Sequence, residues 1–246
     1  MLRFSRKQLG IPYFLFLLLF VVFPLVLIIL YAFTKVDPNG SIVLSGVKVS
    51  ITLDNFIEFF SKSSNIRVLF ISFGLAIVTT ALCLIIAYPL AYILSKSKLN
   101  KSGVLLLLFI VPMWINFVLR TAAMKELLFA IGMYNSNKLS FVNTVIGMVY
   151  DYLPFVIMPL YTVMIKLDKS LIEASQDLGA KPSSTFLRIT LPLTVPGIVS
   201  AVTMVLLPTT TSYVVSDTLG NGNVTFIGKF MNRSFQRCLT GTQVRL

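Results

Sequence analysis

Long apolar runs alternate with short polar segments along most of the chain. The apolar runs cover roughly residues 11–33, 68–94, 103–119, 144–165 and 193–215. A helix of about 20 apolar residues crosses the hydrocarbon core of a bilayer, so each run is a candidate span. The first run follows a basic segment and is too long for the apolar core of a signal peptide. The pattern therefore predicts an all-α, polytopic transmembrane helical bundle whose first span is not cleaved.

The polar segment between the first two runs carries shorter elements. Residues 43–53 alternate apolar and polar side chains, which predicts a strand. Residues 54–60 place their apolar side chains at helical spacing, which predicts an amphipathic helix. Both elements belong to a loop and not to a span.

Basic residues beside the runs predict the orientation of the bundle. Three basic residues lie within residues 1–10, and three lysines without an acid lie within residues 95–102. Such loops stay on the cytoplasmic side. We therefore expect residues 1–10, 95–102 and 166–192 in the cytoplasm. Residues 34–65 and the tail at 216–246 are then outside, although the basic side chains of the tail fit poorly there.

Composition agrees with a membrane protein and excludes several other classes. The 246 residues are 56% hydrophobic and 12% charged, against about 25% charged in soluble domains. The net charge of +12 comes from bases beside the spans, which indicates lipid contact and orientation and no nucleic acid partner. The sequence has no histidine, and its two cysteines, Cys83 and Cys238, are far apart. We therefore expect no catalytic site, no metal site and no cofactor.

One polar stretch, Ser170–Pro192, separates the last two runs. Ser170 and Glu173 have the spacing of a capping box, which starts a helix. Gly179 stands where a positive φ ends that helix, and Pro182 stands where a second helix can begin. The face of the first helix is small and apolar: Leu171, Ala174, Ser175 and Leu178. The pattern predicts two short helices that form a rigid knob.

The same stretch resembles the EAA signature of permease subunits of binding-protein-dependent ABC importers. That signature reads EAA, three free positions, Gly, nine free positions and I-x-L-P. The chain matches every spacing, with Ser in place of the second Ala: Glu173, Ala174, Ser175, Gly179, Ile189, Leu191 and Pro192. In that family the loop is cytoplasmic and docks into an ATP-hydrolysing subunit, and the resemblance implies the same here. The alternative is an ordinary amphipathic hairpin on the membrane surface.

Three further segments resemble the spermidine/putrescine branch of this family. They are Val111–Trp114 followed by Arg120-Thr121, Tyr150–Phe155, and Pro208 followed by Tyr213–Asp217 and Leu219-Gly220. The resemblance implies a multi-pass subunit of the bacterial inner membrane. Its partners would be a second permease subunit, two ATP-binding subunits and an extracellular polyamine-binding protein. Ala122–Met124 and Thr209–Ser212 depart from the branch, which keeps a permease for another small solute as an alternative.

The chain itself encodes no ATP site. Gly228-Lys229 lacks the earlier glycine of a P-loop, and Phe230 replaces the Ser or Thr that ligates Mg²⁺. We therefore expect a transporter subunit and not an enzyme, with ATP hydrolysis on a separate subunit. The family has six spans and this sequence shows five, and Cys238–Leu246 look unlike a permease loop. We expect an aberrant tail, and a truncated, non-transporting remnant is a further alternative.

Asp151 is the only acid inside a predicted span. A charge in the membrane is costly and usually faces a pathway or a partner. A carboxylate beside aromatic faces suits an organic ammonium ion. We expect five residues along a substrate pathway: Asp151, Tyr150, Tyr152, Trp114 and Tyr213. The alternatives are a hydrated Asp151 at the membrane interface and an interfacial anchor at Trp114, and we favour a structural ion-pair partner for Arg120.

Overall fold

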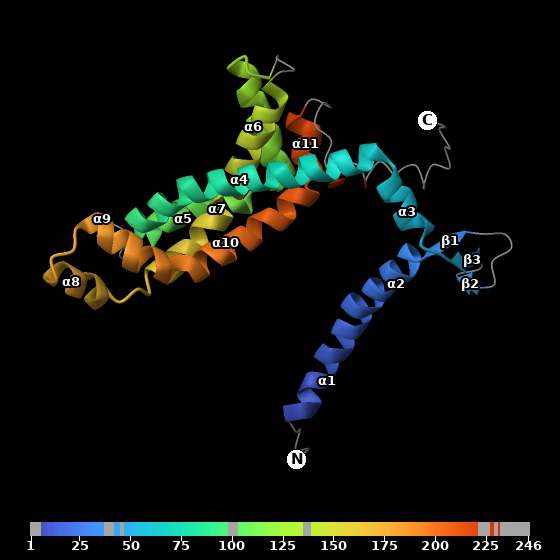
Figure 1. The fold of residues 1–246 in the computed structure, drawn as a ribbon, viewed down its shortest axis with the longest axis horizontal. Helices are drawn as coiled ribbons and strands as arrows, with labels where there is room; N and C mark the ends of the chain where they lie inside the picture. Colours follow the sequence, from blue (N-terminus) through green and yellow to red (C-terminus); the bar gives the residue numbers. More distant parts are fainter. Residues whose placement is uncertain are drawn as a thin grey trace. The chain divides into compact units, whose positions relative to one another are not determined.

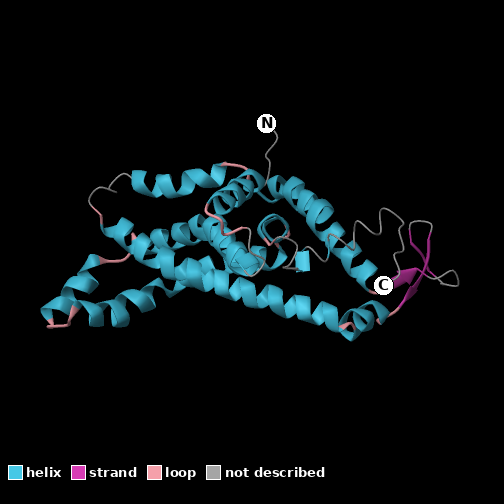
Figure 2. Ribbon diagram, turned by 90° about the horizontal axis from the view of Figure 1, so that it is seen from above, coloured by secondary structure: helices cyan, strands magenta, loops and turns pink. Residues whose placement is uncertain are grey.

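The structure is a computed structural model, which describes residues 6–36, 42–44, 47–97, 103–134, 139–220, 227–228 and 231. Helices make up most of this part, and one small sheet accompanies them (Figure 2). The chain divides into two compact units, Met1–Arg67 and Val68–Leu246. The expected all-α, polytopic class is confirmed.

The first unit holds one long apolar helix. It consists of α1 (Arg6–Leu17), a π-helical turn at Leu18–Val22 and α2 (Phe23–Ala32). Its stretch Gly10–Ala32 is long and apolar enough to cross a membrane. The π turn lies directly before Phe23-Pro24, where the proline ring crowds the carbonyl four residues back and the helix widens. This helix matches the span expected at residues 11–33.

A three-stranded antiparallel sheet follows, in the order β1-β3-β2. Its strands are β1 (Thr34–Val36), β2 (Ile42–Leu44) and β3 (Val47–Ile51). The alternating stretch at residues 43–53 therefore contributes two strands where we expected one. The expected amphipathic helix is present as α3 (Asp54–Ser61). The Asn55 side chain donates hydrogen bonds to the carbonyls of Ala32 and Thr34, which tie α3 to the end of α2.

The second unit is a helical bundle with a projecting hairpin (Figure 1). Its helices pack around a core that α4, α6, α7, α10 and α11 supply. Helices α7 and α10 lie side by side over much of their length. In chain order the elements are α4 (Ser63–Lys96, which starts in the first unit), α5 (Val104–Ile110), a 3₁₀ turn at Val111–Trp114, α6 (Phe117–Ala130), α7 (Ser140–Met164), α8 (Lys169–Asp177), α9 (Pro182–Thr185), a π turn at Phe186–Thr190, α10 (Leu191–Thr211) and α11 (Val214–Leu219).

In the described part of the chain, four helices are long and apolar enough to be spans, and a bent pair makes a fifth. The four are Gly10–Ala32, Ser63–Lys96, Ser140–Met164 and Pro182–Thr211. Prolines lie inside each of these helices, and membrane-spanning helices tolerate proline. The five candidates correspond in order to the five apolar runs of the sequence.

Two of these spans differ from the expected course. The third was expected as one span at residues 103–119, but Val104–Trp114 and Phe117–Ala130 meet at 94°. The chain leaves the helix at Ile115, and the Asn116 side chain then caps α6 by accepting from the Val118 N–H at 2.9 Å. The fifth, expected to reach residue 215, ends at Thr211, and α11 is a separate helix. Most of the tail at residues 216–246 lies outside the described residues.

Candidate functional site

The hairpin between α7 and α10 contains the EAA-like residues. Helix α8 begins at Lys169, and its N-cap is Asp168, whose carboxylate accepts a hydrogen bond from the Ser170 N–H at 2.9 Å. The expected capping box between Ser170 and Glu173 is therefore wrong, because the cap lies two residues earlier. The bond from the Ser170 backbone N–H lowers the pKa of the Asp168 carboxyl. Glu173 lies exposed on the helix and takes no part in the cap.

Gly179 ends α8 with φ at +79°, as its place in the sequence predicts. Its N–H donates to the Gln176 carbonyl at 2.8 Å, and the Ala180 N–H donates to the Ser175 carbonyl at 3.0 Å. A Cβ at Gly179 would meet no atom of this chain within 4 Å. Within the chain, the requirement for glycine here is the left-handed backbone and not crowding.

Ser175, the one departure from the EAA signature, connects the two arms of the hairpin. Its hydroxyl lies 2.9 Å from the Thr185 hydroxyl and also donates to the Ile172 carbonyl at 2.7 Å. Both side chains are buried. An alanine at this position would leave the Thr185 hydroxyl without this partner. The sequence offered no local signal for Thr185, which lies ten positions further on.

A π turn joins the hairpin to the span at the I-x-L-P residues. In this turn, Phe186–Thr190, the Leu191 N–H bonds to the Phe186 carbonyl, five residues back. Pro192 follows, has no N–H, and crowds the carbonyl of Arg188. The Phe186 ring packs edge-on against Tyr88 and Tyr92 of α4, with centroids 5.7 and 5.8 Å away. The hairpin is thus attached to two spans.

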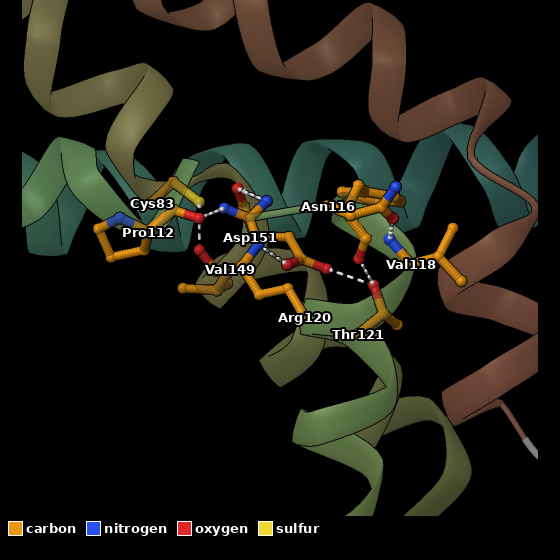
Figure 3. Close-up of polar contacts among 9 residues, drawn as sticks. Cys83, Pro112, Asn116, Val118, Arg120, Thr121, Val149 and Asp151 are labelled. Carbon is orange, nitrogen blue, oxygen red and sulfur yellow. Dashed lines mark hydrogen bonds and ion pairs between the residues drawn. The ribbon is translucent and has the colours of Figure 1, made fainter. Parts of the chain in front are cut away.

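The second group of candidate residues lies inside the bundle. Asp151 is near the middle of α7, about 17 Å from its first residue at 1.5 Å per residue. Asp151 is 0% exposed, which contradicts the alternative of a hydrated carboxylate at the membrane interface. Its Oδ1 atom accepts from Nε of Arg120 at 2.8 Å (Figure 3). The interpretation of Arg120 as an ion-pair partner is confirmed.

Further hydrogen bonds satisfy both charges. The Thr121 hydroxyl donates to Oδ2 of Asp151 at 2.9 Å (Figure 3). The Nη1 and Nη2 atoms of Arg120 donate to the Pro112 carbonyl at 3.1 Å and to the Asp151 carbonyl at 3.2 Å. The guanidinium carbon is 5.8 Å from the Phe117 ring centroid and 5.9 Å from that of Tyr150. The sequence analysis did not assign Thr121 or Phe117 to this site. A buried acid in a span needs polar partners, which was the available signal for Thr121.

The other expected pathway residues lie in different surroundings. Tyr152 is buried, and its ring centroid is 6.2 Å from those of Phe117 and Phe155. Trp114 is 79% exposed at the bend, and Tyr213 is 48% exposed before α11. The structure therefore brings Asp151, Tyr150 and Tyr152 close to Arg120. Trp114 and Tyr213 face outward from this chain. Among the described residues no group of three His, Cys, Asp or Glu side chains could hold a metal ion.

Comparison with known proteins gives a consistent set of relatives. No family model matches the chain. It is 37% identical over 232 residues to the spermidine/putrescine transport system permease protein PotB of Escherichia coli. The aligned region covers 89% of this chain and 82% of that protein. The protein of the same name from Haemophilus influenzae is 34% identical over 235 residues, which are 90% of this chain and 80% of that protein. A PotB homolog of Mycoplasma pneumoniae is 34% identical over 146 residues, which are 56% of this chain and 51% of that protein.

Proposed function

Because the chain belongs to the family of PotB-type transport system permeases, we propose that it is the membrane-spanning permease subunit of an ATP-driven importer of spermidine and putrescine. The observation that carries this proposal is the 37% identity over 232 residues to a spermidine/putrescine transport system permease protein. The chain is a transporter subunit and not an enzyme. It is a multi-pass protein of the bacterial cell membrane and one component of a multi-subunit transport system.

The partners that we propose follow from this assignment. A second permease subunit would complete the pathway, and two ATP-binding subunits would supply hydrolysis. An extracellular polyamine-binding protein would deliver the substrate, while membrane lipid surrounds the spans. We propose no nucleic acid partner.

Coupling to ATP hydrolysis is assigned to the hairpin at residues 166–192. Closure of the ATP-binding subunits would move the knob Glu173–Gly179, and the spans would follow. Three observations support this role: Asp168 and Gly179 fix both ends of α8, the Ser175–Thr185 bond joins the arms, and Phe186 packs on α4. A hairpin of this construction transmits a displacement because its parts do not move separately. Ile189, Leu191 and Pro192 belong to the joint with α10.

The substrate pathway is assigned to the surroundings of Asp151, with Tyr150, Tyr152, Trp114 and Tyr213 along it. A carboxylate inside the membrane with aromatic rings nearby supports this assignment, since such groups replace the water that an ammonium ion loses. In this conformation the carboxylate is paired with Arg120. The pair carries no net charge, so the path presents a cation site only when Arg120 leaves it.

Uptake in cells tests the proposal. Radiolabelled spermidine and putrescine are offered to a strain that lacks its own polyamine importers and carries this chain with its partner subunits. We expect uptake that depends on ATP, on the binding protein and on this chain. Uptake of another labelled solute, with no uptake of spermidine or putrescine, would favour a permease for a different substrate and overturn the assignment.

A further inference from the structure

The head group of Arg120 occupies a site with the chemistry of a receptor for an organic cation. Its hydrogen-bond partners are acceptors: the Asp151 carboxylate at 2.8 Å, the Asp151 carbonyl at 3.2 Å and the Pro112 carbonyl at 3.1 Å. The rings of Phe117 and Tyr150 lie within 6 Å of the guanidinium carbon. An alkylammonium group donates to the same acceptors and is attracted by the same rings.

These partners come from three segments that meet at the bend of the third span. Pro112 belongs to the arm before the bend, Arg120 and Phe117 belong to α6 after it, and Asp151 belongs to α7. The two arms meet at 94°. The guanidinium of Arg120 therefore links both arms of the bend to the neighbouring span (Figure 3).

Opening the pair without another cation is costly. Arg120 is 5% exposed and Asp151 is 0% exposed, so separation alone would leave two unpaired charges in a membrane helix bundle. An unpaired buried charge is strongly unfavourable, and exchange of one cation for another keeps the carboxylate paired, so only the displaced guanidinium needs new surroundings. Thr121 continues to donate to Oδ2 of Asp151 during such an exchange, since Arg120 uses Oδ1.

We propose that Arg120 is an internal competitor of the cationic substrate. Without substrate its guanidinium fills the Asp151 site and holds the bend in the third span. An ammonium group of the polyamine displaces it, and α6 is then free to change its angle to the preceding arm. This inference rests on the proposed polyamine transport, and it makes the opening of the span conditional on a substrate of positive charge.

A distance measurement across the bend tests whether Arg120 holds the bend in the third span. Spin labels at Leu108 and Leu127, exposed on the two arms, are placed in the assembled importer with Cys83→Ala and Cys238→Ser. We expect spermidine to shift the label distance in the parent. Arg120→Met, which keeps the length and removes the charge, should shift it without substrate. An unchanged distance in Arg120→Met would overturn the proposal.

Transport kinetics test the competition. Arg120→Met removes the competing cation, and we expect KM for spermidine to fall by about threefold or more, since the site is no longer occupied in the resting state. Lys125→Met removes a positive charge from the same helix without contact to Asp151, and its KM should equal that of the parent. A purely structural Arg120 would reduce the amount of active importer and leave KM unchanged, which would contradict the proposal.

The double variant Arg120→Met/Asp151→Asn covers the case in which Arg120→Met does not assemble. It contains no unpaired charge, and we expect an altered label distance that spermidine no longer changes. A parent-like distance and a parent-like response would overturn the inference. The proposed function fails separately, when the parent itself takes up neither spermidine nor putrescine. In that event the substrate-free distances of the parent and Arg120→Met still decide whether the pair holds the bend.

Discussion

The hydroxyls of Ser175 and Thr185 lie 2.9 Å apart and join the two arms of the hairpin between α7 and α10. In the EAA signature the position of Ser175 is an alanine. In this chain the position takes part in a buried hydrogen bond between α8 and α9. Because buried hydroxyls need partners, the two positions should depend on each other.

Ser175→Ala should loosen the hairpin, because it leaves the Thr185 hydroxyl buried without this partner. We expect a loss of about 1 to 2 kcal/mol in the local opening free energy, measured by hydrogen exchange of the amides at residues 178–180. Ser175→Ala/Thr185→Val should recover most of the loss. Ser183→Ala, at an exposed position of α9, is the matched control and should change nothing. Equal exchange in Ser175→Ala and the parent would contradict the prediction.

Gly179→Val should uncouple ATP hydrolysis from transport, because a β-branched residue resists the φ of +79°. The conformational cost is about 1 to 2 kcal/mol. Uptake and ATPase activity are measured together in the reconstituted importer.

Gly179→Asn separates two causes of uncoupling, the backbone conformation and the added side chain, since asparagine tolerates this backbone but adds a side chain. We expect Gly179→Asn to retain coupling. Equal failure of both variants would mean that the docked partner, and not φ, requires the glycine. Gly74→Ala, where a Cβ meets no atom within 4 Å in a regular helix, is the control.

The start of α8 gives a prediction that reverses the one from the sequence. Asp168→Ala should fray the first turn, and Glu173→Ala should leave it intact, because Asp168 is the cap. Hydrogen exchange of the Ser170 amide measures this. The pKa of Asp168 is lowered from 3.8, so the cap contributes fully at pH values above 3.8 and is lost as pH falls through the lowered value. Faster exchange in Glu173→Ala at pH 7 would show that the glutamate does take part.

How much of the hairpin could be predicted depended on how local its signals are. Gly179 was predicted correctly because a helix end with positive φ is a property of a few adjacent residues. The N-cap was wrong by two positions because Asp168 and Ser170 are both good caps. The backbone distinguishes them: Asp168 is extended, with φ at −69° and ψ at 121°, whereas Ser170 already lies within α8. The Ser175–Thr185 bond needed the angle between two helices, which a linear sequence does not contain.

The buried network was predictable only in part. The unusual acid at Asp151 was visible in the sequence, and Arg120 was proposed as an ion-pair partner. Arg120 and Asp151 are separated by 31 positions in the sequence, so no helical periodicity indicates their contact. The bend in the third span that brings them together was not predicted. The apolar run at residues 103–119 looks continuous by hydropathy, since the break needs only two residues outside helical geometry, Ile115 and Asn116.

Labelling with a membrane-impermeant maleimide tests the orientation. Lys62→Cys lies at the end of α3, in the loop between the first two spans, and Lys181→Cys lies at the tip of the hairpin, both exposed. We expect Lys62→Cys to react in intact cells and Lys181→Cys to react only after the membrane is opened. The reason is the position of the basic loops relative to the spans. Reaction of Lys181→Cys in intact cells would refute the orientation.

The π turn at Phe186–Thr190 sets the rotation of the hairpin relative to α10. It shares one feature with the π turn at Leu18–Val22, since in each the next residue bonds five positions back and a proline follows. Pro192 cannot donate to the carbonyl of Arg188 and crowds it. The wider turn therefore depends on the proline of the I-x-L-P residues.

Pro192→Ala should convert this turn to α-helix, because alanine supplies the missing N–H. The variant keeps the number of residues, so the change from hydrogen bonds five residues back to bonds four residues back rotates the preceding segment by about 100° relative to α10. That rotation carries the Phe186 ring away from Tyr88 and Tyr92. A cysteine pair at positions 92 and 186 reports this through cross-linking with a short bifunctional maleimide, whose yield should drop in Pro192→Ala together with transport. Pro196→Ala is the matched control, since Pro196 lies in regular α-helix in α10, and its yield should match that of the parent. Equal yields in the two alanine variants would show that Pro192 does not determine the rotation of the hairpin.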